Sequence, residues 1–347
     1  MTTIGVGTVK GAFLLRSGDR SEWALEGPQF KGWSVTTFGR APSGEHLLAT
    51  GSNWFGAAIQ RSRDLVTWEQ VVAGPAWPQG GDRKLNNIWA IGSVGDVLFA
   101  AVDEAGLFRS EDGGTSWHPV DGFNEHPTRP GWRPGFGGLA AHRFLSDSED
   151  PDRMWLAVSA VGVFRSEDGG ETWALRNDGV DKTAPSDDYD EIGYCVHCIV
   201  ADPEDADTIW RQDHSGVYRT SDGGDRWERI ETGLPARFGF PMVRDDASGA
   251  LFVVPLQSDE HRMPVDGAFR VYRSTDRGDS WHVSGAGQPE EPFYAGVLRD
   301  AAATDGDGGV YLGSTAGTVH LTTDGGDHWS TVPNVLPRIL SVAVLES

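Results

Sequence analysis

The sequence predicts an all-β protein, a seven-bladed β-propeller that is closed by its own two ends. Three observations lead to this prediction. Glycine supplies 46 of the 347 residues and tryptophan 14, which is typical of short strands joined by tight turns. One short motif recurs along the whole chain. The two ends of the chain together supply the strands of one further four-stranded blade.

The recurring motif has Ser or Thr first, Asp third, Gly fifth and Trp eighth. Five copies are complete, and two earlier copies are one residue shorter and lack the glycine. The aspartates of successive copies lie 45 to 56 residues apart. Such a period is typical of a repeat architecture in which each repeat is one small sheet. The copies cover 17–23, 62–68, 110–117, 166–173, 220–227, 274–281 and 322–329.

Each copy reads as the turn of a β-hairpin. An apolar strand precedes it, the Asp side chain can accept backbone N–H groups of its own turn, and Gly supplies a positive φ. The Trp begins the return strand. The motif resembles the Asp-box, S/T-x-D-x-G-x-x-W, of the BNR-repeat β-propellers. Because turn residues of this kind usually serve the fold, we expect the motif to be structural and to take no part in chemistry.

Four short strand patterns occur in each repeat, and we assign them to one blade. The stretch 2–27 supplies only three strands, while a lone strand at 338–345 follows the last repeat. Joining these ends completes the first blade and leaves no open sheet edge. We therefore predict one domain, 1–347. Its other six blades cover approximately 33–70, 85–120, 137–175, 195–231, 238–283 and 294–333.

Charge and composition exclude several classes of function. The chain has 29 Lys and Arg against 51 Asp and Glu, a net charge of −22, so phosphate backbones and anionic membranes would repel it. We expect no nucleic-acid partner and no membrane association. Neither a long apolar run nor a secretory signal is visible, which favours the cytoplasm. The sequence indicates no nucleotide or organic cofactor and leaves the oligomeric state open.

The order of strands predicts which loops share a face. The start of each first strand and the turn between second and third strands lie on one face, called here the top, and the Asp-box turns lie on the other. Propellers usually bind ligands at the channel mouth on the top face. The longest irregular segments fall there, and loops of this length are uncommon unless functional. They are 71–86, 122–137, 181–194 and 255–269.

Three histidines are the candidate metal ligands. Aligning the fourth and fifth repeats on Trp155 and Trp210, 55 residues apart, places His142 opposite His197 on the innermost strands. His214 lies in the next top turn. Neutral imidazoles that converge on a polar channel can hold Zn, Mn, Fe or Cu. The alternative, that each ring only hydrogen-bonds a neighbouring loop, stays open.

Both cysteines flank His197. On a strand, Cys195 and Cys198 point to opposite faces, so we expect neither a disulfide nor a shared ion. Cys195 faces the same side as His197 and is a candidate third ligand or nucleophile. Cys198 is assigned to the core.

The other candidate site residues come from the top loops. Glu191 leads into the His197 strand and is a candidate general base or metal ligand, whereas Asp187, Asp188 and Asp190 before it are read as a solvated face. Arginines there could clamp a carboxylate or sulfate, and aromatic rings could stack on a sugar. Surface ion pairs and packing between blades are the alternatives. The catalytic candidates are Glu191 and Arg262, and the substrate-binding candidates are Arg133, Tyr194, Phe240, Glu260 and His261.

The resemblance leaves the function open, because BNR-repeat propellers include sialidases, xyloglucan-type glucanases, the sortilin ectodomain and a photosystem II assembly factor. The Arg-Ile-Pro motif of sialidases does not occur here, which argues against that activity. We favour a cytoplasmic, metal-dependent hydrolase or lyase that acts on an anionic or sugar-like small molecule. The alternative is a non-catalytic propeller that binds a protein partner through its long top loops.

Overall fold

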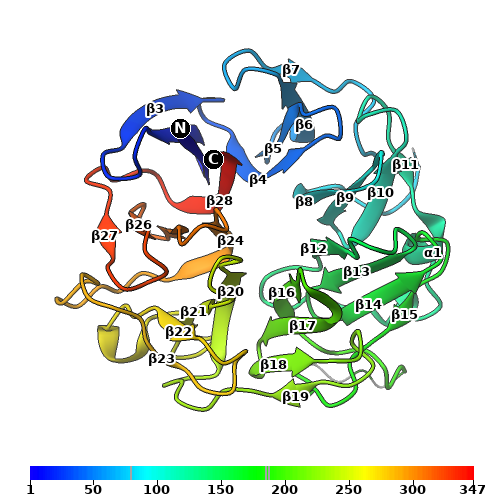
Figure 1. Ribbon diagram of the computed structural model, residues 1–347. Helices are drawn as coiled ribbons and strands as arrows, with labels where there is room; N and C mark the ends of the chain where they lie inside the picture. The colour runs from blue at the N-terminus through cyan, green and yellow to red at the C-terminus, as the bar shows by residue number, and fades with distance from the viewer. Residues whose placement is uncertain (79, 184–185, 187) are drawn as a thin grey trace. The chain divides into compact units, whose positions relative to one another are not determined.

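The computed structural model describes residues 1–78, 80–183, 186 and 188–347 (Figure 1). Its strands form seven four-stranded sheets. Helix in this part of the chain is limited to α1 (Asp121–Asn124) and the 3-10 turns η1 (Arg129–Gly131) and η2 (Val265–Gly267). The structure confirms the predicted fold class, an all-β, seven-bladed β-propeller.

The strands of each blade follow one another along the chain, except in the first blade. The first blade contains β1 (Thr2–Thr8), β2 (Gly11–Ser17), β3 (Ala24–Gln29) and β28 (Ile339–Glu346). The second contains β4 (Ser34–Arg40), β5 (His46–Ser52), β6 (Gly56–Ser62) and β7 (Glu69–Gln70). The third contains β8 (Asn87–Val94), β9 (Val97–Asp103), β10 (Gly106–Ser110) and β11 (His118–Pro119).

The remaining blades repeat this pattern. The fourth contains β12 (Ala141–Ser146), β13 (Arg153–Val158), β14 (Gly162–Glu167) and β15 (Ala174–Leu175). The fifth contains β16 (Val196–Asp202), β17 (Asp205–Asp213), β18 (Val217–Thr220) and β19 (Glu228–Arg229). The sixth contains β20 (Phe238–Arg244), β21 (Leu251–Leu256), β22 (Tyr272–Ser274) and β23 (His282–Val283). The seventh contains β24 (Val297–Thr304), β25 (Val310–Ser314), β26 (Val319–Thr322) and β27 (Ser330–Thr331).

The C-terminal strand completes the N-terminal blade, as predicted. Strand β28, red in Figure 1, pairs antiparallel with β1, in blue, so that Gly5 lies opposite Ala343 and Val6 opposite Val342. Every residue of β1 is buried, and its other edge pairs with β2. Without β28, the backbone N–H and C=O groups along one edge of β1 would have no strand partner.

The chain divides into two compact units. One comprises Met1–Val35, Trp210–Arg219 and Glu228–Ser347, and the other comprises Thr36–Ile209 and Thr220–Trp227. Each has its own apolar core, built from alternate residues of the strands. The first core includes Ile4, Val6, Phe252, Val297, Leu312 and Trp329. The second unit contains one cluster around Phe123, Leu156 and Trp173 and another around Leu47, Val102 and Phe108.

The Asp-box turns are held by their own side chains. In all five full copies the first-position hydroxyl donates to the Asp carboxylate and accepts the backbone N–H of the fifth-position glycine. The same carboxylate accepts the backbone N–H of the seventh residue. In the copy at Asp276, hydrogen bonds from the hydroxyl and N–H of Ser280 and from Ser274 lower the carboxyl pKa to about 2. The motif is thus a self-contained turn.

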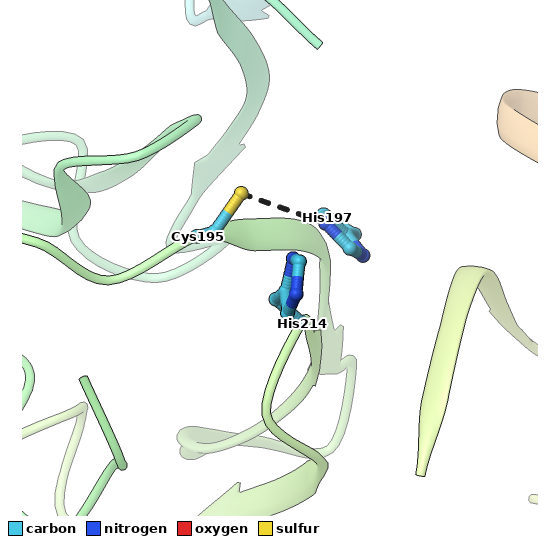
Figure 2. Close-up of side chains that lie close together, drawn as sticks. All are labelled: Cys195, His197 and His214. Atoms are coloured by element: carbon cyan, nitrogen blue, oxygen red, sulfur yellow. Dashed lines mark hydrogen bonds between the residues drawn. The ribbon is translucent and has the colours of Figure 1, made fainter. Parts of the chain in front are cut away.

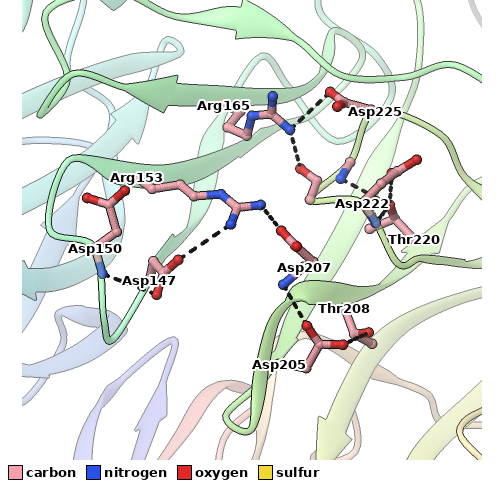
Figure 3. Close-up of polar contacts among 12 residues, drawn as sticks. Asp147, Asp150, Arg153, Arg165, Asp205, Asp207, Thr208, Thr220, Asp222 and Asp225 are labelled. Carbon is pink, nitrogen blue, oxygen red and sulfur yellow. Dashed lines mark hydrogen bonds and ion pairs between the residues drawn. The ribbon is translucent and has the colours of Figure 1, made fainter.

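A repeated ion pair joins consecutive copies. The arginine just before one copy binds the acidic residue at the sixth position of the next copy, at 2.8 to 3.2 Å. Figure 3 shows one of these pairs, Arg165 with Asp225, beside Arg153, which binds both Asp147 and Asp207. Because these arginine and acidic side chains pair with one another, they connect the Asp-box turns and serve the scaffold. The four repeated pairs are Arg109–Glu171, Arg165–Asp225, Arg219–Asp279 and Arg273–Asp327.

Candidate metal centre

A thiol and an imidazole meet at the start of β16. Cys195 precedes the strand and His197 is its second residue, so both side chains point to the same side. Cys195 Sγ lies 3.6 Å from His197 Nε2. Cys195 is half-buried and His197 is buried. Both cysteines are free thiols, as expected, and Cys198 is buried.

His214 joins this pair from the turn between β17 and β18. Figure 2 shows the three side chains together. Each offers one ligand atom, and these atoms lie within 4.8 Å of one another. Two imidazoles and a thiol suit zinc, iron or copper better than magnesium or calcium, which prefer oxygen ligands. Two of the three predicted histidines thus lie with Cys195, the candidate third ligand, in a group whose donor types suit a transition metal.

His142 does not belong to this group of three. It is the second residue of β12, the position that His197 has in β16, as the alignment of the two repeats predicts. Its Nε2 lies 3.0 Å from the backbone carbonyl oxygen of Val196, so it donates to the neighbouring blade. The 55-residue offset also places Ala140 opposite Cys195 and Ser159 opposite His214. The fourth blade thus has a single imidazole where the fifth has two imidazoles and a thiol.

Asp259 is a site residue that the sequence analysis missed. Its Oδ2 lies 3.3 Å from His214 Nε2, and the imidazole also stands edge-on to Phe238, with ring centres 5.0 Å apart. Asp259 lies in the loop between β21 and β22. The sequence analysis chose its neighbours Glu260 and His261 in the same loop, and both are exposed.

Arg262 lies in the same loop, and its side chain reaches Phe240 of β20. Arg262 has a φ of 50° and its Nε donates to the backbone oxygen of Asp259, at 3.2 Å. Its guanidinium carbon lies 5.4 Å from the centre of the Phe240 ring. Phe240 is only 3% exposed and packs with Phe238 and Leu256. Because β20 is buried along its whole length, this ring offers no open face for stacking on a ligand.

The remaining candidate residues have different surroundings and contacts. Glu191 is exposed, and Arg133 donates to the backbone oxygens of Pro130 and Trp132. Tyr194 is half-buried, with the Lys182 ammonium 5.8 Å from its ring centre. The predicted solvated face is exposed at Asp188 and Asp190. Asp187 lies outside the described residues.

No protein family model matches the chain. A xyloglucanase of Paenibacillus sp. is 26% identical over 293 residues, which cover 76% of this chain and 26% of that enzyme. The photosystem II assembly lipoprotein Ycf48 of Synechococcus sp. is 23% identical over 230 residues, 55% of this chain and 62% of Ycf48. The chain therefore spans about a quarter of the one relative and under two thirds of the other.

Solved structures give the same two resemblances. Ycf48 bound to a D1 peptide superposes with a TM-score of 0.58 at 15% identity, covering 87% of this chain and 81% of that one. An ancestral GH74 enzyme gives 0.57 at 16% identity, covering 85% and 38%. This likeness shows the fold. Both relatives fall within the set that the Asp-box resemblance implied. No helix in the described part of the chain has the length and apolarity needed to cross a membrane.

Proposed function

We propose that this protein is a metal-dependent β-propeller enzyme, a hydrolase or lyase for an anionic or sugar-like small molecule. The observation that carries the proposal is the meeting of Cys195, His197 and His214, with ligand atoms within 4.8 Å of one another. Three protein ligands are the usual number at a catalytic zinc, which keeps a further position for water or substrate. Such an ion, when bound, acts as a Lewis acid and lowers the pKa of bound water.

Two residues of the top loops are proposed for the remaining roles. Glu191 precedes Cys195 by four residues, and its exposed carboxylate is the proposed proton acceptor. Arg262 follows Asp259 by three residues and is the proposed contact for an anionic group of the substrate. The similarity to xyloglucanases supports a sugar-like substrate. A thiol ligand must stay reduced, which favours the cytoplasm.

A protein partner is the second candidate. Large aromatic side chains stand exposed in turns of the described chain, led by Phe136 at 96% and by Trp54 at 89%. Exposed aromatic rings are enriched where proteins bind other proteins. The likeness to Ycf48, solved with a D1 peptide, supports the same role. In this case the long loops bind a protein segment and no reaction occurs.

Metal content separates the two candidates. We expect about one zinc, iron or copper ion per chain by elemental mass spectrometry, removable with a chelator. His197→Ala and His214→Ala should each lower the metal content at least tenfold, because three-ligand sites tolerate the loss of a ligand poorly. His142→Ala is the matched control and should keep the metal, since that ring hydrogen-bonds Val196. A wild-type protein without metal would favour the protein partner.

A further inference from the structure

The end of β17 is polar where its counterpart in the neighbouring blade is apolar. Residues 211–213 are Arg-Gln-Asp and are at most 2% exposed, with Arg211 and Asp213 at 0%. The same 55-residue offset places Leu-Ala-Val, residues 156–158, at these positions in the fourth blade. Burying an ion pair costs desolvation that packed apolar side chains avoid. The fold alone therefore does not require these polar residues.

The buried pair is tied to the turn that carries His214. Arg211 Nε donates to Asp213 Oδ2 at 2.8 Å, and Nη2 of Arg211 contacts the same oxygen. The other carboxylate oxygen accepts the backbone N–H and the hydroxyl of Ser215, at 3.1 and 3.2 Å. The backbone N–H of Asp213 donates to Gly216 O at 2.8 Å. One carboxylate thus joins Arg211 of the strand to Ser215 of the turn.

Two other side chains hold the same turn from outside. Gln212 Nε2 donates to the backbone oxygens of Asp213 and Arg237, at 3.0 and 3.1 Å. Arg229 donates to Ser215 O at 2.7 Å. The backbone on either side of His214 is therefore fixed by buried polar contacts, and its ring is fixed by Asp259 and Phe238.

We propose that Arg211 and Asp213 are positioning residues, which hold the turn at 213–216 so that the His214 imidazole stays beside Cys195 and His197. The inference rests on the proposed function and extends it to residues that touch neither metal nor substrate. Holding a ligand in place before the metal arrives lowers the entropy lost on binding.

The fourth blade supplies the test variant, the double substitution Arg211→Leu with Asp213→Val. Because both charges leave together, no unpaired charge remains, and the melting temperature should stay the same or rise. Zn²⁺ affinity, measured against a competing chelator, should fall at least about tenfold. In the metal-free protein, long-range ¹H–¹⁵N NMR of the His214 ring should show one narrow set of signals in the wild type and broad or multiple signals in the variant.

Matched variants complete the design. Arg273→Leu with Asp327→Val removes an ion pair from the Asp-box turns and should leave Zn²⁺ affinity unchanged. Asp213→Val alone removes the carboxylate that pairs with the buried Arg211 guanidinium, so this variant should unfold. Adding Arg211→Leu should restore folding.

Each outcome has one meaning. A folded double variant with wild-type Zn²⁺ affinity and wild-type His214 signals overturns the positioning role. So does a double variant that unfolds, because the pair would then serve the fold. A wild type that binds no Zn²⁺, but whose His214 signals depend on the pair, overturns the proposed metal function and supports the positioning role.

Discussion

The Asp-box turns and the candidate metal centre differ in that the turns repeat along the chain, whereas the group of Cys195, His197 and His214 occurs in one blade. Five full copies share the same hydroxyl, carboxylate and glycine contacts. The centre instead lies where the fifth blade departs from the fourth, with Cys195 for Ala140 and His214 for Ser159. In a propeller, residues and contacts that recur in every blade serve the fold. Residues that occur in one blade alone are the candidates for function.

The largest expected effect concerns the repeated scaffold. Deleting Ile339–Glu346 removes the partner of the fully buried β1 and leaves an open edge. We expect loss of cooperative unfolding, or aggregation, in a thermal melt followed by circular dichroism. Removing only the exposed Ser347 should change nothing. A deleted protein that melts like the full chain would mean that β1 needs no second partner.

The next prediction compares the loss of stability on replacing a buried Asp-box tryptophan with that on replacing an exposed tryptophan. Trp173 is 6% exposed, and its indole N–H donates to Gly170 O at 3.0 Å. Trp173→Ala should cost roughly 3–5 kcal/mol in the free energy of unfolding, measured in urea, because it empties a large core site. Trp54→Ala, at an 89% exposed position, should stay within about 0.5 kcal/mol of the wild type. Loss of bound metal in a folded Trp173→Ala protein would contradict the separation of scaffold and site.

The sequence predicted the scaffold because the signals for it are local and repeated. Turn residues, strand alternation and the missing fourth strand of the first blade were enough for the fold. His197 was also within reach because the repeat alignment pairs it with His142, and His214 because it lies in the next top turn. The alignment could not tell that His142 binds the carbonyl of Val196, because that contact depends on how two strands approach each other.

The sequence misjudged one residue and missed three others because it does not report tertiary contacts. Phe240 was a candidate for stacking, but every residue of β20 is buried and this ring packs with Phe238 and Leu256. Asp259 reaches His214 from a loop that is about 45 residues away in sequence, and no local pattern reports such a contact. Arg211 and Asp213 would have stood out if the two blades had been compared residue by residue for buried charge.

A pH-dependent effect tests a histidine that belongs to the scaffold. His320 takes the place of Phe108 and Phe164 in its blade, and stacks on Phe269 with ring centres 4.7 Å apart. Burial lowers its pKa from 6.5 to about 4. The folded state therefore resists protonation, so stability is complete above pH 6.5 and falls by about 1.4 kcal/mol per pH unit between 6.5 and 4.

His320→Phe should flatten this part of the stability curve, as measured by urea unfolding at several pH values. His282→Phe, at an exposed position, is the control and should keep the wild-type slope. Equal slopes for the wild type and His320→Phe would show that another group controls the acid response.

The smallest effect concerns the ion pairs that join consecutive Asp-box turns. Arg273 and Asp327 lie 2.8 Å apart with side chains 29% and 62% exposed, so solvent screens the pair. A double-mutant cycle with Arg273→Met and Asp327→Asn should give a coupling of roughly 0.2–1 kcal/mol, and less in high salt. Because the pair occurs four times, the four pairs together should contribute about as much to the free energy of unfolding as one buried apolar side chain does. This contribution is distributed over several blades. Metal content should not change in any of these variants. A coupling energy well above this range, or one that does not depend on salt, would mean that more than charge joins the turns. The turns of that blade could then no longer be assigned to the scaffold alone.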